Sequence, residues 1–172
     1  MTTQPDQTDD DVAPPFTTRD YRAQDAEALR ALCREAIVET GASAYTEAQL
    51  LAWAAHACDD AQQFAERREQ GWVRIAIDEN GIVGFGQIDL PGHISMLFVA
   101  PHAGRQGVAG ALLDDLVMLA EAMGARSVTV DASRIAQPFF LKHGFGEIST
   151  ETVDIDGQQL TRCRMEARVG RR

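Results

Sequence analysis

The sequence predicts an α/β domain with a mixed sheet of about seven mostly antiparallel strands and about four helices. Three observations support this fold class. Helical and strand patterns follow one another in the order β-α-α-β-β-β-α-β-α-β-β. Asn80-Gly81 lies between two apolar, strand-like segments, which is typical of a hairpin turn. Residues 94–130 have the pattern of a strand, a glycine-containing loop, a helix and a strand, and therefore predict one parallel, right-handed βαβ unit.

The first part of the chain predicts one strand followed by helices. Residues 16–22 alternate loosely between polar and apolar, which indicates a first strand. From Asp25, apolar residues recur at helical spacing, and Gly41 ends that helix. Residues 59–70 are polar and helix-forming, and Gly71 ends this segment.

A helix start lies between these two segments. Thr46 and Gln49 have the spacing of a capping box, in which the threonine side chain accepts the amide of the third helical residue. Tyr45 and Leu50 stand where a hydrophobic staple places its two members.

The middle of the chain predicts three strands in sequence. Residues 72–77 and 82–88 flank the Asn-Gly turn as two arms of a hairpin. Pro91-Gly92 interrupts the pattern, and residues 94–99 follow as a strand apolar enough to lie centrally in the sheet.

The last part of the chain completes the βαβ unit and adds a hairpin. A long helix follows the glycine loop, with one apolar face made of Val108, Leu112, Leu116, Leu119 and Met123. Gly124 ends this helix, and residues 127–130 form the next strand. A short helix over 134–143 precedes two final strands, 145–153 and 158–165.

Composition indicates one domain with an acidic leader. Residues 1–15 contain four aspartates and no basic residue, and they end in two prolines, so we expect a disordered leader before a domain at residues 16–168. No apolar run reaches the roughly 18 residues of a membrane span. The three cysteines show no metal-like spacing, which favours packing roles in a reducing, cytoplasmic compartment.

The net charge of −10 argues against nucleic acid as a partner, because nucleic-acid binding depends on clustered Lys and Arg. An acidic surface instead favours encounter with cations, amines among them.

The segment Gly104–Gly110 leads from a strand directly into a helix. Small residues allow backbone amides to approach an anion, and the helix N-terminus adds partial positive charge, so this loop suits a phosphate or pyrophosphate. A tight turn without a ligand is the alternative. A dinucleotide-binding fold is a second rival, with Asp131 as its ribose-binding acid, but too little chain follows for a second mononucleotide half. A P-loop is excluded because no Gly-Lys-Ser/Thr occurs.

Two motifs resemble those of the GCN5-related N-acetyltransferases. LFVAPHAGRQGVAGALL is similar to the family's motif A, with Val99, Pro101, Gly107 and Ala109 at matching places and Gly104 where the family usually has Gln or Arg. SRIAQPFFLKHGF is similar to motif B, with matches at three positions, Ala136, Gly144 and Phe145. Ser133 replaces the usual Asn there, and Phe140 replaces the usual Tyr. The segments 42–54 and 157–166 also resemble a bacterial branch of this family.

The resemblance implies a sheet that splays between the strands 94–99 and 127–131, and acetyl-CoA as the cosubstrate. It places the acetyl carbonyl and pantetheine arm along the backbone of Leu97, Phe98 and Val99, with Ser133 and Phe140 also in the cosubstrate site. It assigns the pyrophosphate to the segment Arg105, Gln106, Gly107, Val108, Ala109 and Gly110. No metal is implied, and dimers are frequent in the family, so a homodimer is possible.

The motif matches do not identify the catalytic base or the catalytic acid. Asp131 and Tyr45 are the candidates for the base and the acid, with Asp89 and His93 as further candidates for the base. Asp131 has a structural alternative as a helix N-terminal acid, and Tyr45 has one as a staple residue, which we favour. Phe140 cannot donate a proton, so the thiolate leaves unassisted or another donor substitutes.

These features predict transfer of an acetyl group from acetyl-CoA to a primary amine of a small molecule or peptide, by direct attack in a ternary complex. The alternatives are a non-catalytic acyl-CoA-binding or regulatory domain and, less favoured, a fragment of a dinucleotide-binding oxidoreductase. The acceptor itself is not identified by any motif.

Overall fold

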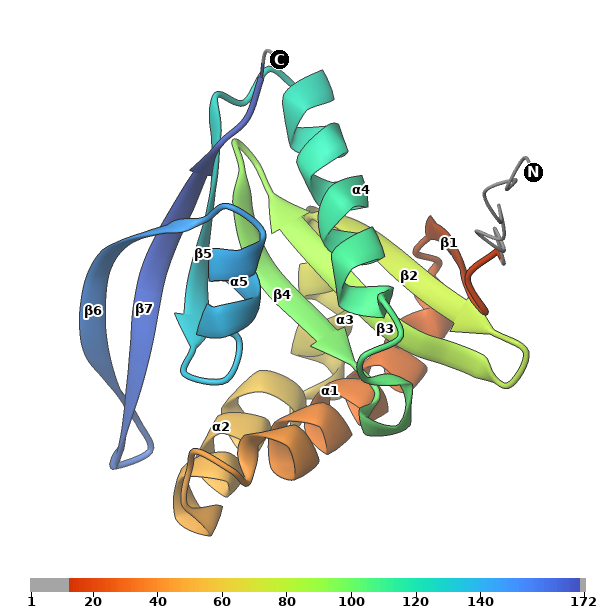
Figure 1. Cartoon of the computed structure of the whole chain (residues 1–172). Helices are drawn as coiled ribbons and strands as arrows, with labels where there is room; N and C mark the ends of the chain where they lie inside the picture. Colours follow the sequence, from red (N-terminus) through yellow and green to blue (C-terminus); the bar gives the residue numbers. More distant parts are fainter. Residues whose placement is uncertain (1–12, 171–172) are drawn as a thin grey trace, which may run out of the picture.

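A computed structural model describes residues 13–170, so the predicted leader lies outside the described residues except for its last three. One seven-stranded sheet runs through the molecule in the order β1-β2-β3-β4-β5-β7-β6 (Figure 1). Its strands are β1 Thr17–Asp20, β2 Trp72–Asp78, β3 Gly81–Asp89, β4 His93–Val99, β5 Ser127–Ser133, β6 Gly146–Ile155 and β7 Gln158–Arg168. The helices are α1 Ala26–Gly41, α2 Glu47–Cys58, α3 Ala61–Gln70, α4 Val108–Ala122 and α5 Gln137–Lys142.

The strand pairing confirms the predicted mixed sheet. β4 and β5 pair in parallel, with α4 as the crossover between them, and the other paired strands of the described chain are antiparallel. A dinucleotide-binding fold would instead need successive parallel βαβ units. The structure therefore excludes the oxidoreductase alternative.

The helices cover both faces of the sheet. Gly84 and Gly86 of β3 face α4: a Cβ at Gly84 would lie 2.9 Å from Val108 Cγ1, and a Cβ at Gly86 would lie 2.8 Å from Leu116 Cδ1. These glycines allow α4 to pack directly against the backbone of β3. On the opposite face, the ring of Phe85 lies 6.4 Å from that of Phe64 in α3.

Local signals in the sequence set several element boundaries. The capping box is present at the start of α2, where Thr46 accepts the amide of Gln49 and the Gln49 side chain accepts the amide of Thr46. The polar segment before Gly71 forms α3, capped by the Asp60 side chain. Near β1, Asp25 is buried and receives two hydrogen bonds from Arg19, which ties the first strand to the start of α1.

The three cysteines are buried free thiols, in agreement with packing roles. Within residues 13–170, no helix combines the length and the apolar character needed to cross a membrane.

Candidate active site

The sheet opens between β4 and β5. Their ladder contains only His93↔Thr129 and Ile94↔Val130, and beyond these pairs the two strands diverge. β4 also carries a bulge at Ser95, because Gln87 pairs with Met96 while Ile88 pairs with Ile94. The predicted splay is therefore present.

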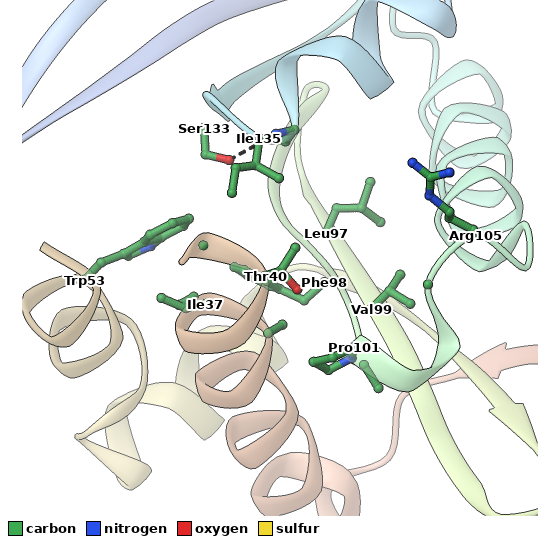
Figure 2. A pocket seen from close by; sticks show the side chains of 15 residues that line it. Ile37, Thr40, Trp53, Leu97, Phe98, Val99, Pro101, Arg105, Ser133 and Ile135 are labelled. Atoms are coloured by element: carbon green, nitrogen blue, oxygen red, sulfur yellow. Dashed lines mark hydrogen bonds between the residues drawn. The ribbon is translucent and has the colours of Figure 1, made fainter. Parts of the chain in front are cut away.

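A cavity of about 480 Å³ follows this opening, and we call it the splay cavity (Figure 2). Leu97, Phe98 and Val99 of β4 form one wall, and Ile37 and Thr40 of α1 lie beside them. Further lining comes from Trp53, Pro101, Arg105, Ser133 and Ile135. Most of the lining residues are apolar, and the polar side chains among them include Thr40, Arg105 and Ser133.

The free edge of β4 presents backbone amides to this cavity. The Ala100 amide donates to Val83 on the β3 side, at 2.8 Å. Because successive amides along a strand point to opposite edges, the Phe98 amide also faces β3, whereas those of Leu97 and Val99 face the opening. The β4 edge therefore offers hydrogen-bond donors where no β5 strand takes them up.

A second cavity, of about 680 Å³, adjoins the splay cavity, and we call it the loop cavity. Both cavities are lined by Val99, Gly104 and Arg105. Arg105 and Gly107 have left-handed backbones, with φ of 62° and 84°. Gly107 caps α4 without a side-chain hydrogen bond. The first amides of the helix lack intrahelical acceptors, and together with the helix dipole they are suited to binding an anion. Lys142 lines the same cavity and adds positive charge.

A third cavity of about 330 Å³, the lateral cavity, adjoins the splay cavity on its other side. The two share Trp53, Phe98 and Ser133. Tyr45, His93 and Asp131 also line the lateral cavity, so polar groups from three distant parts of the sequence meet there.

His93 and Asp131 are neighbours at the start of the splay. Nδ1 of His93 forms a 2.9 Å hydrogen bond with Thr129 Oγ1, and its Nε2 lies 3.9 Å from Asp131 Oδ2. Arg164 donates two hydrogen bonds to Asp131, at 2.8 and 3.0 Å. Burial raises the pKa of Asp131, but the hydrogen bonds from Arg164 and the charges of Arg162, Arg164 and His93 outweigh it, so the pKa lies below its ordinary value. Asp131 is therefore an ionised partner of the histidine and a weak proton acceptor.

Comparison with known proteins relates this arrangement to one family. A family model described as an acetyltransferase (GNAT) domain matches residues 41–167. The uncharacterised N-acetyltransferase YafP of Escherichia coli (strain K12) is 34% identical over 143 residues, which cover 83% of this chain and 89% of YafP. The chain belongs to the GCN5-related N-acetyltransferase (GNAT) family.

Solved structures agree with this assignment. A GCN5-related N-acetyltransferase from Rhodopseudomonas palustris superimposes with a TM-score of 0.87 at 36% identity, over 91% of this chain and 97% of the other. The PaiA N-acetyltransferase of Thermoplasma acidophilum, solved in complex with coenzyme A, shares the fold with a TM-score of 0.72 at 17% identity, over 89% and 98% of the two chains. The protein is thus a GNAT-family acyltransferase.

Most of the residues predicted for the cosubstrate site of this acetyltransferase line the splay or loop cavity. They are Leu97, Phe98, Val99, Arg105, Gly107, Val108, Ala109, Gly110 and Ser133. Gln106 lines neither cavity, and its side chain donates to the carbonyl of His102 at 3.4 Å. Sequence reasoning missed Lys142, whose position two residues before Gly144 in the motif B segment was the available signal.

Phe140 lies in the core and lines none of these cavities, contrary to its predicted place in the cosubstrate site. Its side chain is 2% exposed, and its ring lies 5.2 Å from that of Phe139 and 5.1 Å from that of Phe145. The short helix α5 turns Phe140 inward and leaves Phe139 to line the loop cavity. The physical reason is apolar burial, which a phenylalanine satisfies better than a tyrosine would.

Tyr45 lies in the lateral cavity with its hydroxyl engaged by backbone groups. It accepts the amide of Arg134 at 3.0 Å and donates to the carbonyl of Thr161 at 3.4 Å. Its ring lies edge-on to Trp53, with centroids 5.7 Å apart. These contacts favour a structural role, and the role of Tyr45 in catalysis stays a prediction. Asp89 lies outside all three cavities, so His93 is the base candidate whose imidazole is exposed to the lateral cavity.

Proposed function

We propose that this acetyltransferase transfers an acetyl group from acetyl-CoA to a primary amine of a small molecule or peptide, by direct attack in a ternary complex. The observation that carries the proposal is the open edge of β4, whose cavity shares Val99, Gly104 and Arg105 with the cavity at the N-terminal end of α4. The coenzyme A complex of PaiA, a protein of the same fold, supports it.

The residues present fit acetyl-CoA. The outward amides of Leu97 and Val99 suit the amide groups of a pantetheine arm, and the mainly apolar splay cavity suits its methylene groups. The first amides of α4 and Lys142 would hold the pyrophosphate. Bound there, acetyl-CoA supplies an activated thioester at the boundary with the lateral cavity.

The lateral cavity is the proposed place of the amine. An amine must be neutral to attack, so a base must remove its proton. We propose that His93 does this, directly or through a water, while the nearby anion of Asp131 stabilises the imidazolium that forms. The Leu97 and Val99 amides would stabilise the oxyanion. With Phe140 buried, no side chain at that position protonates the thiolate, which leaves unassisted.

Two measurements test this function. Calorimetry should show binding of acetyl-CoA without added metal. A thiol-release assay over a panel of primary amines, with mass spectrometry of the products, should show release that depends on the amine and a mass gain of one acetyl group. Binding without amine-dependent release would contradict transfer, and absence of binding would contradict the cosubstrate assignment.

A further inference from the structure

The walls of the lateral cavity carry more positive than negative charge. Arg67 and Arg162 line it together with the imidazoles of His56 and His93. Its one carboxylate among the lining residues is Asp131, which already receives two hydrogen bonds from Arg164. The cavity therefore contrasts with the chain as a whole, whose net charge is −10.

Arg67 stands where the lateral cavity meets a further cavity of about 510 Å³. Both are lined by Arg67 of α3 and by Ser95 and Met96 at the bulge of β4. Arg162 is paired with Glu151 at 2.7 Å, but no side chain among residues 13–170 forms an ion pair with Arg67. Arg67 is an exposed residue, and its side chain is available to a ligand.

Arg68 places a second guanidinium beside this junction. It lines the further cavity and is only 3% exposed. Its side-chain partners are neutral: Nε donates to Gln87 Oε1, and Nη1 lies 3.1 Å from Met96 Sδ. The carboxylate of Asp89 lines the same cavity but accepts from Gln87 at 2.7 Å and forms no ion pair with Arg68. Burial lowers the pKa of Arg68, and the charge of Asp89 offsets this only in part.

A buried cation without a paired anion is costly, and a ligand carboxylate would offset that cost. Arginine is also the side chain best suited to carboxylate, since its planar fork donates two parallel hydrogen bonds. A polyamine would be disfavoured here, because two arginines of the same charge lie near it. The one carboxylate that lines the lateral cavity, Asp131, is already hydrogen-bonded to Arg164.

We infer that the acceptor carries a carboxylate as well as its amine, and that the carboxylate binds at Arg67 beside Arg68. The amine then lies in the lateral cavity near His93. The inference rests on the proposed function and narrows its substrate class to amino acids and related small amino carboxylates.

The test compares each amino carboxylate with its amide, which lacks the negative charge. Glycine, β-alanine, 4-aminobutyrate and L-lysine are assayed against their amides, with putrescine as a dication. We expect kcat/KM to be at least about tenfold higher for one or more of the carboxylates than for the matching amide, the usual effect of a charge-assisted hydrogen bond.

Arg67→Gln should raise KM for that carboxylate about tenfold, leave its kcat unchanged and leave the amide unaffected. The matched control is Arg34→Gln, since Arg34 is an exposed arginine that lines none of these cavities and should keep the preference.

A second readout does not need turnover. Binding of N-acetylglycine, N-acetyl-β-alanine and N-acetyl-4-aminobutyrate, relative to their amides, is measured by saturation-transfer NMR in the presence of coenzyme A. Carboxylate-selective binding that weakens in Arg67→Gln supports the inference even if no amine is acetylated, a result that would refute the proposed function alone. Equal use or binding of carboxylates and amides, or a preference for putrescine, overturns the inference while leaving acetyl transfer intact.

Discussion

The hydroxyl of Tyr45 and the imidazole of His93 line the same cavity, but their surroundings predict losses of kcat of very different size when each group is removed. The Tyr45 proton is directed at the carbonyl of Thr161, so we expect Tyr45→Phe to lower kcat by less than about threefold. The imidazole of His93 has an anion, Asp131, beside it and the cavity in front, so His93→Gln should lower kcat about 10²-fold with acetyl-CoA affinity unchanged. Thiol-release kinetics at saturating acetyl-CoA measure both effects, with circular dichroism as the check on folding. A hundredfold loss of kcat in folded Tyr45→Phe would identify that hydroxyl as the proton donor.

The two ends of α4 offer a matched comparison for the anion site. Gly107 before the helix and Gly124 after it have φ of 84° and 86°, and a Cβ at either would meet no atom within 4 Å. Replacing either glycine with Glu therefore costs a similar backbone strain, about 1 kcal/mol. Only Gly107→Glu also places a negative charge at the helix N-terminus, where the pyrophosphate would bind. By calorimetry, we expect Gly107→Glu to weaken acetyl-CoA binding at least tenfold and Gly124→Glu to leave it within about twofold. Equal affinity in both variants would show that the loop does not bind the pyrophosphate.

Across the whole molecule, α4 connects the two halves of the splayed sheet. Val108 and Leu112 belong to the apolar cluster that includes β2 and β3 residues, whereas Leu113 and Leu116 belong to the cluster that includes β5 and β7 residues. Because one helix fills both clusters, we expect the halves to unfold together although their strand ladder is short. Leu116→Ala should lower the free energy of unfolding by about 3 kcal/mol, in a single transition. Denaturation followed by fluorescence of Trp53 and Trp72 and by far-ultraviolet circular dichroism should then give coincident curves, while separated curves would contradict this coupling.

The fold of the whole molecule is largely predictable from the sequence, whereas the residues that line the proposed acceptor site are not. The Asn80-Gly81 turn and the glycine loop are local signals, and each lies where the sequence predicts it. The approach of Arg67 in α3 to the bulge of β4 joins residues far apart in the chain, and no local pattern reports it. The burial of Phe140 is likewise not predictable from local sequence. A six-residue helix with two adjacent phenylalanines does not show which of them faces the core.

The open edge of β4 should also leave a signature in amide hydrogen exchange. The Phe98 amide faces β3 and should exchange slowly whether or not the cavity is filled. The Leu97 and Val99 amides face the opening, so they should exchange fast in the free protein and slow down when acetyl-CoA takes up their hydrogen bonds. Residue-resolved exchange by NMR, with and without acetyl-CoA, would show this alternation. Slowing at all three residues alike would indicate a general tightening of the sheet, whereas slowing at Leu97 and Val99 alone would trace the cosubstrate along the strand.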